Sequence, residues 1–428
     1  MLAMCRILSR AVLSSGKCAV SNAATRKAGS KVLFIFFTLD PQSGFICLNI
    51  RSPFMSRPNT RPEKQGKLGN FFLFAAVLLM MLALGEVVSR KMMPESRMPD
   101  RPQGWAVIPE ESWVEYDSDL GWFHQKNKSA FLEKNELRIP VTTNDLGLRG
   151  AREYALAKPG GISRLYAAGD SFTFGFGVQD NETWPAQMEQ MRSGLQVMNL
   201  GVADYGIDQI RLLLEKFGYA YAPDIVIVAV YPEDFWRATR AFNDAGHGKP
   251  WYRLNPDGTL ALQHHPVPKD KNFSTVQFPE VMSRSPAERV LSHSALYRLS
   301  LKAAGRLRKS LGHEDPDTSR EWLLGRAILK QMVQEIRSHG VEPVIAIVPP
   351  RRWITGTDEP VRQSLIRFGE REAVTVIDLT QVFRKASAEK GVDALYIPDD
   401  HHWTVEGNRL AAETILGKLH LDSGGQTP

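Results

Sequence analysis

The sequence predicts an α/β fold: a doubly wound parallel sheet with a long insertion, preceded by an N-terminal membrane helix. Beyond residue 162, apolar runs of strand length alternate with helical patterns, which is typical of βαβ units. One of these runs, 224–230, is continuous and β-branched, as expected for a strand buried on both faces. An unbroken apolar run at 71–85 precedes this region and predicts the membrane helix.

Five strands and three long helices are expected in this order. The expected strands are 164–168, 197–200, 224–230, 343–348 and 374–379. Apolar residues recur at helical spacing within 208–219, 320–339 and 406–419. Residues 236–320 interrupt the alternation as an insertion. Because open α/β sheets bind ligands at the carboxyl ends of their strands, functional residues are expected in the loops that follow strands.

Composition and charge exclude several classes of protein. Of the 428 residues, 43% are hydrophobic and 23% charged, as in globular chains with a real core. Residues 1–67 carry a net charge of +9 and the rest −3, so we expect no nucleic-acid partner, which would require a basic folded domain. Cysteines occur at Cys5, Cys18 and Cys47, which excludes a disulfide scaffold or a cysteine zinc site beyond residue 47.

The apolar run divides the N-terminal part of the chain. Residues 69–88 are long enough for a transmembrane anchor, and the basic residues before them favour an N-terminus on the inside. A signal sequence cleaved before Glu86 is the alternative, because the three residues before it are small-x-small. Either alternative predicts that the rest of the chain is periplasmic or extracellular, anchored in the membrane or secreted after cleavage.

The segments on both sides of this helix carry weaker signals. Residues 1–54 are interpreted as a gene-model extension or a targeting tail, since Met55 begins a basic segment, 55–68, that suits the start of a signal or anchor. Residues 89–140 are interpreted as a linker and pre-domain segment, and 141–420 as the main domain.

The first candidate functional residue is Ser171, in the sequence Gly-Asp-Ser-Phe-Thr directly after the first expected strand. At a turn from strand to helix its hydroxyl is exposed, and nearby backbone N–H groups point at a developing oxyanion. A serine nucleophile also needs a base within hydrogen-bond reach. The alternatives are a helix N-cap and a phosphate-binding loop, although the glycine pattern matches neither common phosphate motif.

The candidate base lies before the last expected helix, where Asp399 and Asp400 precede His401 and His402. A carboxylate two or three residues before a histidine can hold the imidazole in the correct tautomer and stabilise its charged form. A metal site is the rival interpretation of this cluster. Because no other part of the chain supplies ligands at a recognisable spacing, we expect a catalytic triad with no metal and no cofactor.

Together these motifs resemble the SGNH/GDSL hydrolase family. Residues 169–172 are similar to its first block, which carries the nucleophile. Residues 199–201 are similar to the second, whose glycine N–H, here Gly201, helps to form the oxyanion hole. The last block is similar to 399–403, and the spacing of His402 to Gly407 makes His402 the base and His401 the spare. The resemblance implies a flavodoxin-like three-layer domain over about 140–420.

The family resemblance also implies roles for the two acids. Asp400, in a D-x-H arrangement, is similar to exported branches that modify polysaccharides as O-acetyl esterases or acetyltransferases. Asp399, in a D-x-x-H arrangement, is similar to common esterases of the family. Either acid would orient His402, while the N–H groups of Ser171 and Gly201 would hold the oxyanion.

One block departs from the family pattern, because Glu233 stands where an asparagine usually completes the oxyanion hole. An ionised carboxylate there would repel an oxyanion, and the loss of one donor costs about 3–4 kcal/mol. Three interpretations remain open: burial keeps Glu233 protonated, Asn243 donates from the insertion, or activity is reduced, lost or redirected.

The expected function is therefore serine-dependent hydrolysis of acyl esters, above all acetyl esters, of envelope or secreted carbohydrate. A polysaccharide O-acetyltransferase with the same triad is one alternative. A non-catalytic carbohydrate-binding or assembly protein with a degenerate site is the other, and Glu233 favours it. The basic stretch 287–311 is interpreted as a solvated surface helix, with contact to anionic lipid or acidic polysaccharide as its alternative.

Overall fold

The computed structural model describes residues 34–39, 46–51, 65–92, 106–107, 112–134, 137–243, 247–269, parts of 291–304, 319–356 and 360–421. It divides into two units, 1–76 and 77–428, each described by itself. In the first, β1 (Phe34–Leu39) and β2 (Ile46–Arg51) form an antiparallel pair. Most of the tail 1–54 and of the basic stretch 287–311 lies outside the described residues.

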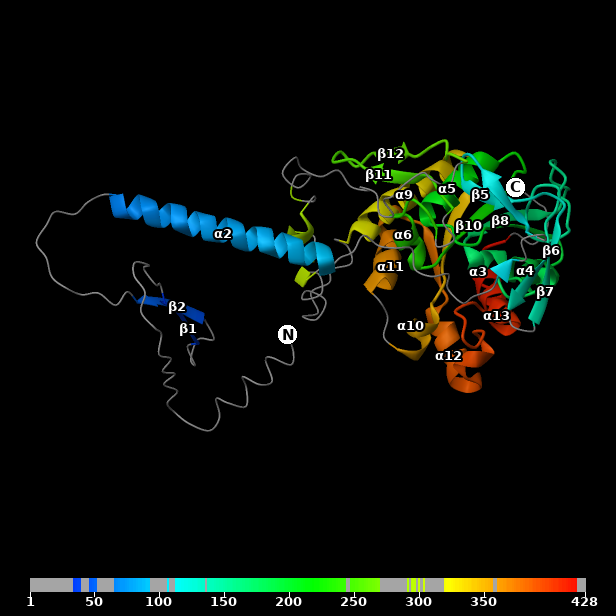
Figure 1. Cartoon of the computed structure of the whole chain (residues 1–428). Coiled ribbons are helices and arrows are strands. Elements are labelled where there is room, and N and C mark those ends of the chain that lie inside the picture. The colour runs from blue at the N-terminus through cyan, green and yellow to red at the C-terminus, as the bar shows by residue number, and fades with distance from the viewer. Residues whose placement is uncertain are drawn as a thin grey trace, which may run out of the picture. The chain divides into compact units, whose positions relative to one another are not determined.

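The second unit is built on a parallel sheet of five strands in the order β14-β13-β10-β8-β9 (Figure 1). The strands are β8 (Ser163–Gly169), β9 (Leu195–Gly201), β10 (Ile225–Val230), β13 (Glu342–Ile347) and β14 (Thr375–Asp378). These are the five strands that the sequence predicts, with ends that differ by one or two residues.

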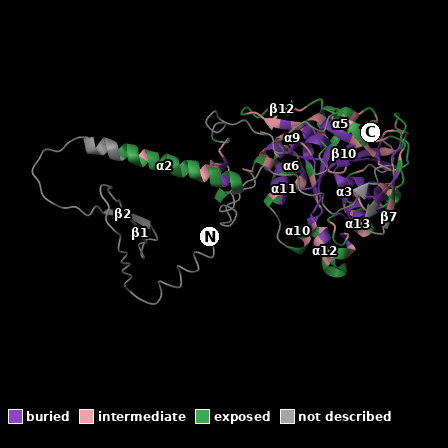
Figure 2. Ribbon diagram, in the orientation of Figure 1, coloured by how far each residue is buried: buried purple, intermediate pink, exposed green. Residues whose placement is uncertain are grey.

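Helices cover both faces of the sheet, which confirms the doubly wound α/β fold. One face packs against α5 (Ile207–Phe217), α9 (Arg320–Ser338) and α11 (Pro360–Glu372). The other packs against α4 (Trp184–Met191), α12 (Thr380–Lys390) and α13 (Val405–Leu416). Alternate residues of β10 enter the two cores, so every residue of this strand is buried (Figure 2).

Short strands before the main sheet also belong to the folded unit. They are β3 (Ala106–Val107), β4 (Val114–Asp117), β5 (Gly121–His124), β6 (Ser129–Lys134) and β7 (Leu137–Thr142). Trp113, Leu132 and Val141 share a core with Phe174 of α3 (Ser171–Phe174). The expected domain start at residue 141 thus falls inside β7, and Trp113, in the expected pre-domain segment, packs in the same core.

The described part of the insertion contains α6 (Glu233–Arg237) and an antiparallel hairpin of β11 (Trp251–Leu254) and β12 (Leu260–Gln263). Ser319 then begins α9, because its side chain accepts a hydrogen bond from the Trp322 N–H. Three further short helices are η2 (Asp180–Glu182), α10 (Arg351–Thr355) and η4 (Val392–Ala394).

Helix α2 (Gln65–Met92) contains the expected apolar segment. Its segment Phe71–Lys91 is long and apolar enough to cross a membrane, and its large apolar side chains from Phe71 to Val88 are exposed (Figure 2). By length and composition it suits a membrane anchor or a signal sequence equally. Near its C-terminal end, Glu86 accepts hydrogen bonds from the Ser294 hydroxyl and from the N–H groups of Ala295 and Leu296.

Candidate active site

Ser171 lies at the tight turn from β8 into α3. Asp170 caps the helix, because its Oδ1 accepts a hydrogen bond of 3.0 Å from the Phe172 N–H. Gly169 permits the turn, since a Cβ there would lie 2.2 Å from Oγ1 of Thr173. As the first residue of α3, Ser171 has an N–H that precedes the helix's own hydrogen bonds and can donate outward.

Ser171 forms one hydrogen-bonded chain with two residues from the far end of the sequence, His402 and Asp400. His402 Nε2 lies 2.8 Å from Ser171 Oγ, and His402 Nδ1 lies 2.6 Å from Asp400 Oδ1. Asp400 also accepts a bond of 2.8 Å from the His402 backbone N–H. Ser171 and His402 are both buried, at 5% and 7% exposure, so these bonds are largely shielded from water. The arrangement suits transfer of a proton from Ser171 to His402.

Asp400 is held in its charged form. Burial raises the pKa of this carboxyl, but the hydrogen bonds and charge of His402 outweigh burial and hold the pKa well below its usual range. An ionised carboxylate can only accept hydrogen bonds. In the neutral form of His402, the ring proton is therefore on Nδ1, and Nε2 is the acceptor that faces Ser171.

The other members of the Asp-Asp-His-His cluster are placed differently. Asp399 is exposed, with a left-handed backbone at φ 57°, and Asp400 is the acid that meets His402 Nδ1. His401 stacks against His402 with ring centroids 4.2 Å apart, and 52% of its side chain is exposed. Burial of the ring and the nearby His402 lower the pKa of His401 to about 4, so this ring is neutral near pH 7.

The same cluster contains possible metal ligands. One ligand atom each of Asp400, His401 and His402 lie within 4.8 Å of one another. Both ring nitrogens of His402 already form hydrogen bonds, however, so a metal ion would have to displace either Asp400 or Ser171. The donor set therefore suits a triad better than a metal centre.

One family model matches the C-terminal part of the chain. Residues 320–427 match a family model described as the SGNH hydrolase-like domain of the acetyltransferase AlgX. This part of the chain is therefore similar to an SGNH hydrolase-like domain.

Among solved structures, a member of the lipolytic protein G-D-S-L family from Veillonella parvula DSM 2008 is 12% identical, with a TM-score of 0.35, and the alignment covers 60% of this chain and 98% of that one. A catalytic mutant of Axe2, an acetylxylan esterase from Geobacillus stearothermophilus, is 14% identical, with a TM-score of 0.35, covering 63% of this chain and 100% of that one. A comparison with curated proteins gives no match.

Gly201 lies beside the serine turn, where it pairs with Gly169 across β8 and β9. Its N–H donates a hydrogen bond of 2.9 Å to Asn199 Oδ1, so it is not free to donate to an oxyanion. Asn199 in turn donates to the Thr173 carbonyl at 2.9 Å. Glycine is needed at 201 for a packing reason, since a Cβ would lie 2.1 Å from the Phe174 nitrogen. The sequence motif predicts the position of this turn correctly. It does not reveal that the Asn199 side chain accepts a hydrogen bond from the Gly201 N–H.

The structure bears on two of the three interpretations of Glu233. Its side chain is 42% exposed and lies 3.3 Å from the guanidinium of Arg352, so Glu233 does not have the buried position that one interpretation requires. Its carboxylate also accepts a hydrogen bond of 3.4 Å from the Tyr231 hydroxyl. Asn243 accepts from the His247 N–H within its own loop, and in the described part of the chain no hydrogen bond joins Asn243 or Glu233 to Ser171.

Arg237 is a buried residue of the site that the sequence analysis missed. Its Nη1 lies 2.8 Å from Asp170 Oδ2 and 2.8 Å from Asp234 Oδ1. Although burial opposes it, these carboxylates raise the pKa of Arg237 above its usual range. Arg237 thus fixes Asp170, whose Oδ2 lies 3.5 Å from Ser171 Oγ. In the sequence, the spacing of three residues between Asp234 and Arg237 is a weak indication of an ion pair between them. Nothing in the sequence indicates the second ion pair, with Asp170.

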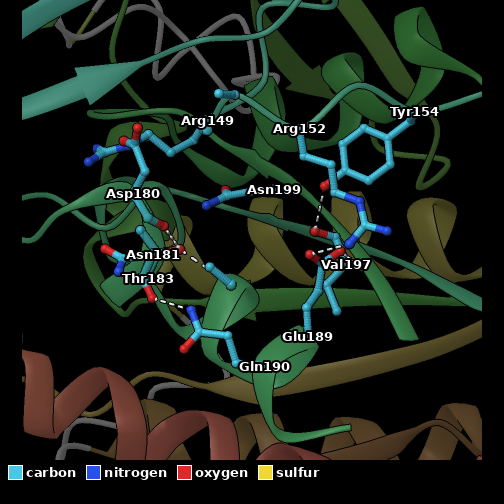
Figure 3. Close-up of a pocket in the computed structure, with 13 residues that line it drawn as sticks. Arg149, Arg152, Tyr154, Asp180, Asn181, Thr183, Glu189, Gln190, Val197 and Asn199 are labelled. Atoms are coloured by element: carbon cyan, nitrogen blue, oxygen red, sulfur yellow. Dashed lines mark hydrogen bonds and ion pairs between the residues drawn. The ribbon is translucent and has the colours of Figure 1, made fainter. Parts of the chain in front are cut away.

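Two cavities flank the SGNH-type site. The larger, about 380 Å³, lies along the outer edge of β9 (Figure 3). Figure 3 shows Asn199 between the Arg149–Asp180 ion pair on one side and the Arg152–Glu189 pair on the other. The smaller, about 240 Å³, is lined by Glu233 and Arg352 among others.

Proposed function

We propose that the chain is a serine-dependent enzyme acting on acyl esters of carbohydrate, in which Ser171 is the nucleophile, His402 the general base and Asp400 the residue that orients it. The observation that carries the proposal is the continuous hydrogen-bonded chain Asp400–His402–Ser171 at the carboxyl end of β8. A buried serine, a histidine whose Nε2 faces it and an ionised acid that orients the histidine are the parts that acyl transfer requires.

The reaction proceeds in two halves. Ser171 Oγ attacks the carbonyl carbon of the ester while its proton passes to His402 Nε2. When the tetrahedral intermediate collapses, His402 returns that proton to the oxygen of the departing sugar, and an acyl group remains on Ser171. The Ser171 N–H donates to the oxyanion, since the N–H of Gly201 is engaged by Asn199.

The second half defines two candidate activities. Attack of water on the acyl-serine gives an esterase, whereas attack of a sugar hydroxyl gives an O-acetyltransferase. In both, His402 removes the proton of the attacking group. The match of residues 320–427 to a domain of an acetyltransferase favours the transferase as the second candidate. With α2 as a membrane anchor or signal sequence, we place the reaction outside the cytoplasm, on envelope or secreted carbohydrate.

Release of p-nitrophenol from p-nitrophenyl acetate tests this proposal. The full chain in detergent is compared with Ser171→Ala, with and without a sugar oligomer as acceptor. We expect turnover that falls at least 10³-fold in the variant, the scale associated with loss of a triad nucleophile. Acceptor-stimulated turnover with an acetylated sugar product would identify the transferase. Equal rates from folded wild type and variant would contradict the proposal.

A further inference from the structure

A mixed polar and aromatic cavity lies at the carboxyl ends of β10 and β13, the position where open α/β sheets bind ligands. Its volume is about 240 Å³, and Glu233, Trp236, Glu321 and Arg352 lie in its wall. Cavities for drug-sized molecules enclose about 300–1,000 Å³, so this one suits a smaller group such as a single sugar ring.

Tyr231 connects this cavity to the serine. Strand β10 is the direct neighbour of β8, whose end leads to Ser171. The Tyr231 hydroxyl donates to Glu233 in the cavity wall at 3.4 Å, while its ring lies 4.7 Å from the ring of Phe172, the residue after the nucleophile. A ligand in the cavity is thus separated from the serine turn by one side chain.

The wall offers the two kinds of contact that bind a pyranose. The indole of Trp236 is 39% exposed and provides an apolar surface for the C–H face of the ring. Arg240 stacks on that indole at 4.4 Å and holds its orientation. The carboxylate of Glu233 and the guanidinium of Arg352, 3.3 Å apart, present a charged acceptor beside charged donors, which can bind neighbouring hydroxyls.

The charge of the cavity favours neutral sugars over acidic ones. Glu233 and Glu321 contribute two carboxylates, and Arg352 is the one cation among the described lining residues. A uronate would add a third carboxylate at close range, and such like charges repel each other. The cavity therefore suits a neutral pyranose better than an acidic one.

We propose that this cavity is a saccharide subsite for a neutral pyranose of the acyl-bearing or acyl-accepting chain, and that Glu233 serves there as a ligand for hydroxyl groups. The inference rests on the proposed function and deepens it. It also gives a reason for the carboxylate that departs from the family pattern at position 233, because the side chain is turned to Arg352 and not to the serine.

Kinetics with three substrates test the subsite. The full chain is assayed on acetylated xylo-oligosaccharide, on acetylated oligomannuronate of equal length and on p-nitrophenyl acetate. We expect wild-type kcat/KM to be at least tenfold higher on the neutral oligomer than on the uronate. In Trp236→Ala and in Glu233→Gln, the ratio of kcat/KM on the neutral oligomer to that on p-nitrophenyl acetate should fall at least tenfold, mainly through KM. Glu389→Gln, on the exposed face of α12, is the matched control and should keep both values.

A binding measurement separates failure of the subsite from failure of the proposed chemistry. Xylo-oligosaccharide is titrated calorimetrically into the Ser171→Ala chain and into the same chain with Trp236→Ala. A Kd at least tenfold weaker in the double variant supports the subsite even if Ser171 proves dispensable for hydrolysis. Equal Kd values, an unchanged kinetic ratio, or preference for the uronate would overturn it.

Discussion

At the residue scale, the candidate site depends on whether Asp399 or Asp400 holds the imidazole of His402 by a hydrogen bond. The two candidates, Asp399 and Asp400, differ by one position in the sequence. In the structure Asp400 accepts from both the ring and the backbone N–H of His402, whereas Asp399 is exposed with a left-handed backbone. The paired bonds to Asp400 fix the ring, and its low pKa keeps it ionised as the acceptor.

Substitution of each acid in turn tests this assignment. Asp400→Asn should lower kcat on p-nitrophenyl acetate by about 10³–10⁴-fold, since an amide can favour the wrong histidine tautomer. Asp399→Asn should remain within about threefold of wild type, because a surface substitution away from the hydrogen-bonded chain perturbs little. Steady-state kinetics of the two folded variants decide the matter. A larger loss from Asp399→Asn than from Asp400→Asn would reverse the assignment.

At the element scale, the small strands before the main sheet support the nucleophile's helix. His124 of β5 lies beneath α3, with its ring centroid 4.9 Å from that of Phe174 and its Nδ1 2.9 Å from the Gly147 carbonyl. Its ring is buried, and burial, together with the charge of Arg149, lowers its pKa to about 4. Protonation of His124 therefore favours the unfolded state, in which the ring is exposed to water.

The sign of that coupling gives a stability prediction. In the unfolded chain His124 has an ordinary pKa of about 6.5, so between pH 6.5 and 4 the unfolded state binds the extra proton and stability falls as the pH falls. From pH 7 to 5 this residue should remove about 2 kcal/mol from the free energy of unfolding. Urea unfolding at both pH values, for wild type and His124→Gln, measures it. An undiminished pH dependence in the variant would show that another group is responsible.

Strands, helices and site residues could be predicted from the sequence where a single local pattern of residues determines them. The strand β10 is apolar throughout because both of its faces are covered, and Ser171 and His402 lie in compact motifs beside predicted elements. The strands β4–β7 were missed because they are short and carry mixed side chains, and the eight-residue α4 shows only a brief periodic pattern. A period of two or 3.6 residues needs several repeats before it is detectable.

Details of the site that depend on distant contacts were not predictable. Arg237 meets Asp170 across 67 positions of sequence, and no local pattern marks that ion pair. The bond from Gly201 to Asn199 arises from one backbone turn, although the motif itself suggested a free N–H. Glu233 had to be seen beside Arg352 before its exposure could be known. Packing in three dimensions decides each of these.

At the scale of the whole molecule, the sheet separates two hydrophobic cores. The residues of the candidate site lie at the carboxyl ends of its strands. The carboxyl ends of β8, β10 and β13 lie side by side, so Ser171, Glu233 and Arg352 come from three successive strand ends of the same sheet. In a doubly wound fold this edge is the ligand-binding edge. The apolar helix α2 lies before this domain in the chain and suits a membrane anchor or signal sequence.

The central claim is that His402 makes Ser171 a nucleophile, and covalent trapping tests it most directly. The full chain is treated with a fluorophosphonate probe, and the modified residue is located by mass spectrometry of peptides. We predict one adduct per chain, on Ser171, formed at least 10²-fold more slowly in His402→Ala, because the serine then lacks its base. Absence of an adduct on Ser171, or labelling that is as fast without His402, would contradict the account.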